Sequence, residues 1–244
     1  VLGGTITGGV TGAAILTLGG TESGGASAVN GIISNGAATS LSIVKTGTGI
    51  WLFAGGSTAN TYTGSFTISQ GQVNYSNQNA FSSASSLVLG DASTGSNNVA
   101  LMSRTASTLT KAVTVSSQGS GTATLGSAIG ANSTMSGIIT INRDIILAQT
   151  TNNGVVSFTG KITGTGNLTI DSPVTTTAAG SFVGLTLTNG TNDFVGNVTL
   201  NSMGASGPGT QYGLRLNATT NVGVIPDASN ITMNTGSVLT LDNN

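Results

Sequence analysis

The side chains of this chain that are best suited to chemistry are its acids, because it contains no histidine and no cysteine. Two carboxyl groups that converge on a glycosidic bond can cleave it. The seven acidic residues lie far apart in the sequence: Glu22, Asp91, Asp144, Asp171, Asp193, Asp227 and Asp242. Without histidine or cysteine there is no Ser-His or Cys-His nucleophile system and no usual zinc ligand set. We therefore predict that the chain is not an enzyme; a carbohydrate-cleaving enzyme, which needs these acids to converge, is kept as a third alternative.

Glycine-rich stretches raise the question of a phosphate loop or a calcium-binding repeat. Gly47–Gly49 and Gly164–Gly166 read GTG, but no G-K-[ST] follows either of them and no helix is expected there. The tandem G-G-x-G-x-D motif of calcium-binding repeats is absent from the sequence. Arg143 and Asp144 are adjacent and are expected to form a solvated turn pair that contributes little stability. The sequence predicts no metal and no cofactor.

The charge of the chain limits its partners. Only 5% of its residues are charged, the net charge is −1, and the six basic residues are scattered, whereas phosphate binding needs clustered Lys and Arg. No apolar run approaches the ~20 residues of a membrane-spanning helix. The chain opens at Val1 in VLGGTITGG, which resembles a strand rather than a signal peptide. We predict no nucleic acid, no membrane span, and a chain that was processed or cut from a longer polypeptide.

Short strands are the elements that the sequence supports. Val, Ile and Thr are frequent, there are three prolines, and no window shows the 3.6-residue period of an amphipathic helix. Short segments instead alternate apolar residues with Thr, Ser or Asn, and turn-forming Gly, Asn and Ser clusters separate them. The predicted strands include residues Ala14–Leu18, Leu41–Val44, Ser65–Ser69, Ser86–Leu89, Ala112–Val115, Gly137–Asn142, Asn167–Ile170, Leu185–Thr188, Asn197–Asn201 and Ser237–Asp242.

Two of these regions repeat. KTGTGIWLF (Lys45–Phe53) returns as ITGTGNLTI (Ile162–Ile170), and NTYTGSFTIS (Asn60–Ser69) returns as NDFVGNVTLN (Asn192–Asn201). The two segments lie further apart in the second copy, which therefore holds an insertion within 171–191, and we expect that insertion to add about one turn. The residues of the second copy that match the first are Gly164, Gly166, Asn192, Phe194, Gly196 and Thr199.

The aromatic residues Trp51, Phe53 and Tyr62 allow two interpretations. They could form a flat platform on which a sugar stacks, or they could fill the core. In the second copy their places are taken by Leu168, Ile170 and Phe194, which keep apolar bulk and lose the indole. This pattern favours packing over a sugar site.

Strands with one apolar face must bury that face, and stacking them coil upon coil does so. Coils ~4.8 Å apart would pair each backbone with its neighbours, with Val, Ile and Leu inside and Thr, Ser and Asn outside. Inward Asn residues at turns could form ladders of amide hydrogen bonds. At ~20 residues per coil we expect about twelve coils. The prediction is an all-β protein, one continuous β-solenoid array over residues 1–244.

The stretch Lys45–Val73 resembles the autotransporter-associated β-strand repeat of bacterial surface proteins. The pattern is K-T-G-x-G-x-W-x-L/F, a short link, and N-x-Y-x-G-x-x-x-I-x-x-G-x-V. The residues that carry it are Lys45, Gly47, Gly49, Trp51, Phe53, Asn60, Tyr62, Gly64, Thr67, Ile68, Gly71 and Val73. The resemblance implies a right-handed parallel β-helix, export, and a scaffold without enzyme activity. The full motif covers about an eighth of the chain.

Two functions remain open beside the enzyme. The first is a non-catalytic structural protein outside the cell, which builds a fibre, filament or coat at a bacterial surface. Its partners would be copies of itself or adjoining segments of the same chain, stacked axially by strand pairing, because both VLGGTITGG and GSVLTLDNN are strands without a protecting cap. The alternative is an adhesin segment that binds surface glycans along its lateral face.

Overall fold

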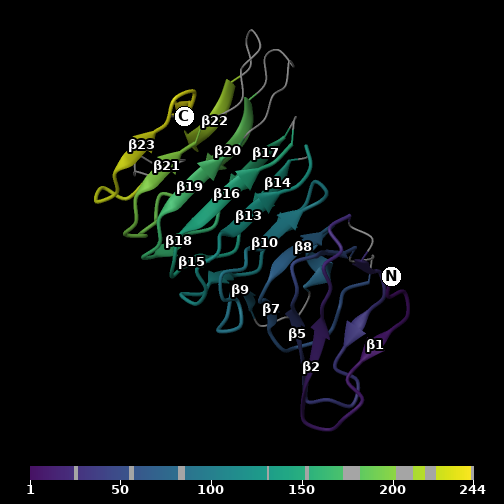
Figure 1. Ribbon diagram of the computed structural model, residues 1–244. Coiled ribbons are helices and arrows are strands. Elements are labelled where there is room, and N and C mark those ends of the chain that lie inside the picture. Colours follow the sequence, from purple (N-terminus) through teal and green to yellow (C-terminus); the bar gives the residue numbers. More distant parts are fainter. Residues whose placement is uncertain are drawn as a thin grey trace.

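The computed structural model describes residues 1–24, 27–54, 58–81, 86–130, 132–151, 154–172, 182–201, 211–217 and 224–242. The described residues form an all-β parallel solenoid of about eight turns, which confirms the predicted fold class. Strands succeed one another along one axis, with the two termini at opposite ends (Figure 1). A single 3-10 turn, η1 (Gln78–Ala80), is the helical element among these residues.

The longest wall of the solenoid is a nine-stranded parallel sheet. Its strands, in spatial order from the N-terminal end, are β3 (Ser27–Val29), β6 (Ile50–Phe53), β8 (Gly71–Tyr75), β10 (Val99–Ser103), β13 (Ala123–Ser127), β16 (Ile145–Gln149), β19 (Leu168–Asp171), β21 (Val198–Leu200) and β23 (Ile231–Met233). Each inner strand pairs with the strand one turn before it and the strand one turn after it, and β3 and β23 are the two outermost strands.

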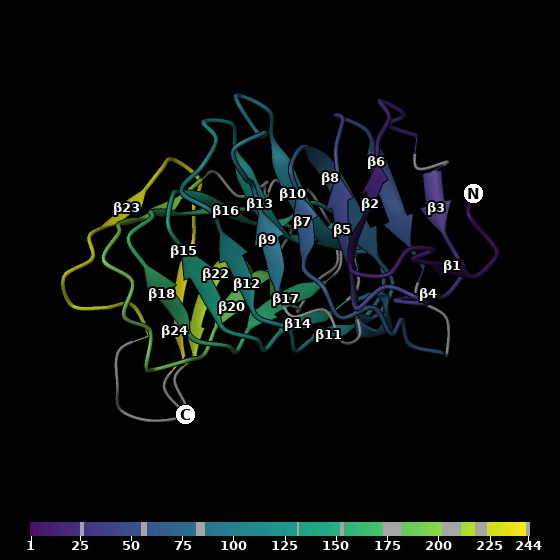
Figure 2. The same ribbon diagram turned by 90° about the horizontal axis from the view of Figure 1, so that it is seen from below.

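The other walls are built in the same way, and Figure 2 shows the walls around the axis. A seven-stranded sheet contains β2 (Ala13–Leu18), β5 (Ser40–Lys45), β7 (Phe66–Ile68), β9 (Leu87–Leu89), β12 (Val113–Val115), β15 (Ile139–Ile141) and β18 (Ile162–Gly164). A six-stranded sheet contains β11 (Thr108–Leu109), β14 (Ser133–Met135), β17 (Val155–Phe158), β20 (Phe182–Leu187), β22 (Gln211–Asn217) and β24 (Leu239–Asp242). The pair β1 (Ile6–Thr7) and β4 (Ile33–Ser34) forms a separate two-stranded sheet.

The turns are longer and fewer than the sequence predicts. In the nine-stranded sheet one turn runs from Trp51 to its stacked partner Val73, and a much longer one runs from Leu200 to Met233. The expectation of about twelve short coils is therefore wrong, since the structure has about eight turns. The reason is the corners, because segments such as 90–98 and 116–122 join successive strands without belonging to either sheet.

Alternation along each strand places the core inside the walls. In β12 and β15 the outer residues of each triplet are buried and the middle one is partly exposed. The buried apolar side chains form one continuous cluster along the axis, from Leu18 to Val224. Every strand predicted from alternation contains or overlaps a strand of the structure.

A polar row that the sequence did not reveal lies inside one corner. Tyr75, Ser103, Ser127 and Gln149 are in register at the ends of four successive strands, and none of them is accessible to solvent. Ser103 Oγ lies 2.7 Å from Ser133 Oγ, and Ser127 Oγ donates to the carbonyl of Ile129 at 2.9 Å. Each hydroxyl is therefore satisfied by the chain that leaves the nine-stranded sheet for the six-stranded one.

Candidate functional site

The first repeated segment is a corner of the solenoid. Lys45–Phe53 and Ile162–Ile170 both leave the seven-stranded sheet and enter the nine-stranded sheet, the former from β5 to β6 and the latter from β18 to β19. Gly47 and Gly164 have φ of 70° and 116°, a left-handed conformation that glycine adopts without strain. The repeated pattern therefore marks one way of turning this corner.

Lys45 lies inside the core, although it belongs to the conspicuous motif. It occupies the inward row between Leu18 and Ile68, and its side chain is inaccessible to solvent. Its Nζ donates to the carbonyl oxygens of Thr46 (3.0 Å), Gly47 (2.7 Å) and Gln70 (2.9 Å). The ammonium thus ties its own corner to the corner of the next coil. Burial lowers its pKa from 10.5 to about 8.

This lysine gives the protein an alkaline pH dependence. From about pH 8 to about pH 9.5 the folded chain releases the Lys45 proton while the unfolded chain keeps it, so the free energy of unfolding should rise with pH. Burial raises the pKa of Tyr62 and Tyr75, so above about pH 10 the unfolded chain loses protons that the folded chain holds, and stability should fall. Urea unfolding at several pH values measures both the rise and the fall in the free energy of unfolding.

Lys45→Met is the matched variant for this measurement, because methionine keeps the length and flexibility of the side chain without its charge. The rise between about pH 8 and about pH 9.5 should disappear in Lys45→Met, and the fall above about pH 10 should remain. A rise of equal size in the variant would show that another group is responsible.

The remaining glycines of the motif allow neighbouring coils to approach closely. A methyl group on Gly49 would lie 2.6 Å from the carbonyl oxygen of Glu22, and one on Gly166 would overlap the carbonyl oxygen of Arg143. Gly64 and Gly196 face backbone carbonyls of the preceding coil in the same way. Gly71, which begins β8, has φ of 74° and lies against the corner that Lys45 ties.

The three aromatic residues do not form one exposed surface. Phe53 and Tyr62 are buried, and the Phe53 ring meets the Phe66 ring edge to face at 5.0 Å. Trp51 is partly exposed, packs against the core, and donates from Nε1 to the carbonyl of Gly19 at 2.9 Å. This arrangement supports packing, and it leaves no shared face on which a sugar could stack.

The second repeated segment centres on an asparagine that bridges coils. Asn60 is 4% exposed, accepts from the Ile33 amide at 2.8 Å, and donates to the Ala80 carbonyl at 2.8 Å. Asn192 makes the same two bonds, from the Ile162 amide and to the Val224 carbonyl, each at 2.8 Å. Tyr62 and Phe194, two residues further on, are both buried. The two matched asparagines therefore bridge coils in the same way.

The two copies of this segment nevertheless lie on different walls. Phe66–Ile68 forms β7 in the seven-stranded sheet, whereas Val198–Leu200 forms β21 in the nine-stranded sheet. Thr67 and Thr199 are the outward residues of these strands. The sequence predicts that the insertion adds a turn, and this prediction is wrong. Ile170 and Leu200, on either side of the insertion, are direct partners only one turn apart. Its described part instead supplies β20 on the six-stranded wall; residues 173–181 of the insertion lie outside the described residues.

Three of the acidic residues each contact a different partner, and they do not converge. Asp193 forms an ion pair with Lys161 at 2.6 Å, and this contact lowers the Asp193 pKa. Asp91 accepts from the hydroxyl of Ser69, and Asp242 lies 3.7 Å from Arg215. No group of three acids that could hold a metal occurs in the described ranges. Nor do those ranges contain a helix long and apolar enough to cross a membrane.

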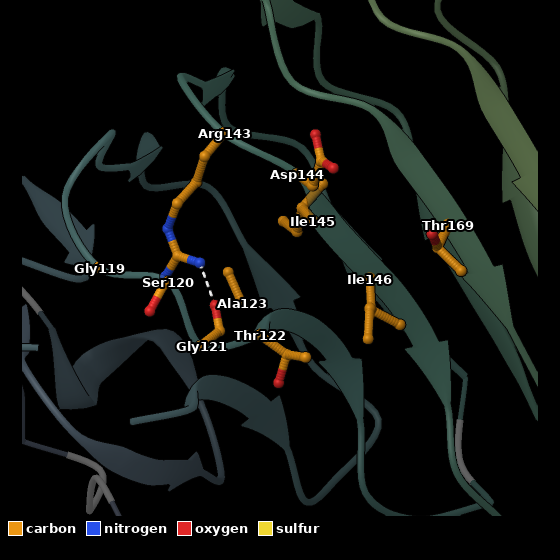
Figure 3. A pocket seen from close by; sticks show the side chains of 10 residues that line it. All are labelled: Gly119, Ser120, Gly121, Thr122, Ala123, Arg143, Asp144, Ile145, Ile146 and Thr169. Carbon is orange, nitrogen blue, oxygen red and sulfur yellow. Dashed lines mark hydrogen bonds between the residues drawn. The ribbon is translucent and has the colours of Figure 1, made fainter. Parts of the chain in front are cut away.

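Arg143 and Asp144 do not form the solvated pair that the sequence suggested. Arg143 donates from Nε to the Ser116 carbonyl at 3.1 Å and from Nη1 to the Gly121 carbonyl, so it holds the corner segment of the preceding coil. Asp144 points away from the guanidinium and is exposed (Figure 3). Its Oδ1 accepts from the backbone amide and the side chain of Asn167, both at 2.9 Å.

Asp144 begins a ladder of polar side chains on the outer surface. Asn167 Oδ1 accepts from the Asn197 amide at 2.8 Å, and Asn197 Oδ1 accepts from the Asn230 amide at 3.0 Å. All four residues are exposed and directly precede strands β16, β19, β21 and β23. The ladder expected from inward asparagines therefore lies outside the solenoid, while Asn60, which is buried, and Asn192, which is partly buried, bond to backbone.

A groove of about 520 Å³ opens where this ladder begins. Residues 116–122 form a long corner, whereas 142–144 and 165–167 are short, so the long corner overhangs the coils that follow it. Ser120 N donates to the Gly95 carbonyl at 2.8 Å, which stacks this corner on residues 90–98. Figure 3 shows the lining, which comprises Gly119, Ser120, Gly121, Thr122, Ala123, Arg143, Asp144, Ile145, Ile146 and Thr169.

Comparison of the chain with protein families, with curated proteins and with solved structures finds no match. The fold therefore rests on the structure, and the likeness to autotransporter repeats rests on the motif of residues 45–73 alone.

Proposed function

We propose that this chain is a non-catalytic structural protein that builds a fibre, filament or coat at a bacterial surface. The observation that carries the proposal is the open last coil. Ile231 and Met233 are in register with Val198 and Leu200, which have no accessible surface, yet they are 40% and 49% exposed. Leu241, in the edge strand β24, is 73% exposed. Within the ranges that the structure describes, core side chains and unpaired strand edges thus face outward at one end of the stack.

The first coils also present an open strand edge, on the seven-stranded sheet. Leu16 of β2 is in register with Ile43, which is fully buried, but Leu16 itself is only partly buried. Because β2 and β23 are outermost strands of parallel sheets, a further coil can add to either end by the pairing that already joins the coils. A copy of this chain or an adjoining segment of the same polypeptide could supply that further coil. This head-to-tail contact repeats without closing, which favours a filament.

Placement outside the cell is part of the proposal. It is supported by the resemblance of residues 45–73 to a surface-protein repeat, and by a chain that builds its core without a single cysteine. The low charge of the surface suits a chain that packs against copies of itself.

The double variant Ile231→Lys/Met233→Lys tests the open end. Two ammonium groups in the inward row cannot be buried without a large desolvation penalty, so end-to-end pairing should be abolished. Sedimentation velocity over a range of concentrations should show growing assemblies for the unmodified chain and monomers for the double variant.

Thr232→Lys is the control, because Thr232 lies between these residues on the outward side of β23. It should assemble like the unmodified chain. Monomers of the unmodified chain at every concentration, or assembly of the double variant, would contradict the proposal.

A second candidate function is an adhesin segment that binds glycans along its lateral face. The groove at Asp144 favours it, since it is a concave site on the wall of the solenoid, away from both ends. The two functions are compatible, because end pairing uses strand edges and the groove uses a side wall.

A further inference from the structure

The groove continues into a regular track on the outer face of the nine-stranded sheet. We define the N-x-T track by its paired outward residues: Asp144 and Ile146, Asn167 and Thr169, Asn197 and Thr199, Asn230 and Thr232. Strand registers stack Ile146, Thr169, Thr199 and Thr232 directly above one another. The residue between each pair points inward, as Leu168 and Val198 do with no accessible surface. Polar groups therefore repeat every ~4.8 Å along the axis.

The ladder holds this track in place. Each amide in it accepts from the backbone of the next coil, so Asn167 and Asn197 are held before any ligand arrives. Both side chains remain exposed, which leaves their other polar positions open to a ligand. A site whose groups are already ordered loses less entropy on binding.

At the Asp144 end of the track, the groove forms a deeper binding site. The overhang of residues 119–121 forms one side, Asp144 lies on the rim, and the partly exposed Ile146 adds apolar surface. The volume of about 520 Å³ is within the range of small-ligand sites, roughly 300–1,000 Å³. A ligand with both hydroxyl groups and C–H faces would match this lining.

Charge selects among such ligands. The Arg143 guanidinium, which lines the groove, is directed into the carbonyls of Ser116 and Gly121. The guanidinium keeps its positive charge, and the carboxylates of Asp144 and Asp171 on the same face balance it. The face therefore has no excess positive charge to attract an anionic ligand, while the Asp144 carboxylate accepts a hydroxyl donor of a neutral one.

We propose that the groove at Asp144 and the N-x-T track bind an extended neutral saccharide chain that lies along the solenoid axis. One sugar sits under the overhang and donates a hydroxyl to the Asp144 carboxylate. The following sugars contact the amide and threonine rows. The proposal rests on the second candidate function and is independent of end-to-end pairing.

The full chain is first screened on an array of neutral and anionic oligosaccharides. A neutral hexasaccharide that binds on the array is then titrated into the chain by calorimetry. Thr169→Arg places a long side chain over the groove and should abolish binding. Asp144→Asn keeps an oxygen for Asn167 and removes the charge, so affinity should fall roughly tenfold, the scale of a lost charge-assisted hydrogen bond.

Thr114→Arg is the matched control. Thr114 is the outward, partly exposed residue of β12 on the seven-stranded wall, as Thr169 is in β19 on the nine-stranded wall. It should bind like the unmodified chain.

The outcomes separate the site from the function. Neutral saccharide binding that survives Thr169→Arg would overturn this site and leave the adhesin function standing. Binding of no neutral saccharide by the unmodified chain, or binding of anionic ones alone, would overturn both. Loss in Thr169→Arg with retention in Thr114→Arg would support the site.

Discussion

Replacement of Asn60 by alanine is expected to lower the free energy of unfolding by roughly 2–5 kcal/mol. The reason is that one side chain satisfies two buried backbone groups in two different coils, the Ile33 amide and the Ala80 carbonyl. Alanine leaves both groups without a partner, and each unsatisfied buried group costs about 1–3 kcal/mol. Guanidinium unfolding followed by circular dichroism measures the change.

Asn192→Ala is the informative comparison. Its side chain makes the same two bonds, but it is only partly buried, so water can replace part of what is lost and the effect should be smaller. Thr67→Ala, at an outward position, should change stability by no more than about 0.5 kcal/mol. An effect at Asn60 no larger than at Thr67 would show that the bridge does not hold the coils together.

Gly166→Ala is expected to destabilise the fold by about 3 kcal/mol, at the upper end of the cost of overpacking. A methyl group there would overlap the carbonyl oxygen of Arg143 in the coil below, and backbone cannot rotate away as a side chain can. The coil above would be disturbed too, because Gly196 lies against the Gly166 carbonyl. Thermal unfolding and hydrogen exchange of strands β16 and β19 would report the separation of the two coils.

Gly9→Ala is the matched control, because a methyl group on Gly9 meets nothing within 4 Å and its φ is not left-handed. It should leave stability unchanged or raise it by a few tenths of a kcal/mol through the unfolded state. Equal losses in both variants would mean that the close approach at Gly166 is unimportant.

The sequence revealed the strands because alternation is local. Triplets such as Val113–Val115 show an inward-outward-inward pattern that needs no knowledge of their neighbours. The number of turns was not readable in the same way, since it depends on how many residues the corners absorb. A signal was present, because the predicted strands that begin at Ser86 and Ala112 are already further apart than the coil length assumed from the sequence.

The sites were harder to read because they depend on pairs of coils. The motif includes Lys45 but does not say which way its side chain points, and only the stacking of Leu18, Lys45 and Ile68 shows that it is inside. The groove arises from a difference in length between one corner and the next, a property of no single motif. The repeated N-x-T spacing was visible in the sequence, but register is needed to align Asn167 with Asn197.

The unequal lengths of the turns, from the short one between Trp51 and Val73 to the long one between Leu200 and Met233, have a consequence for how the chain folds. Closing a coil costs entropy that grows only with the logarithm of its length, so these two turns differ by about 0.4 kcal/mol. The entropy of closing a coil therefore does not make the longer of these turns much harder to form than the shorter one. Each coil needs only a neighbouring coil as a template for its strands. The chain can fold progressively along its axis, without waiting for distant segments to pair.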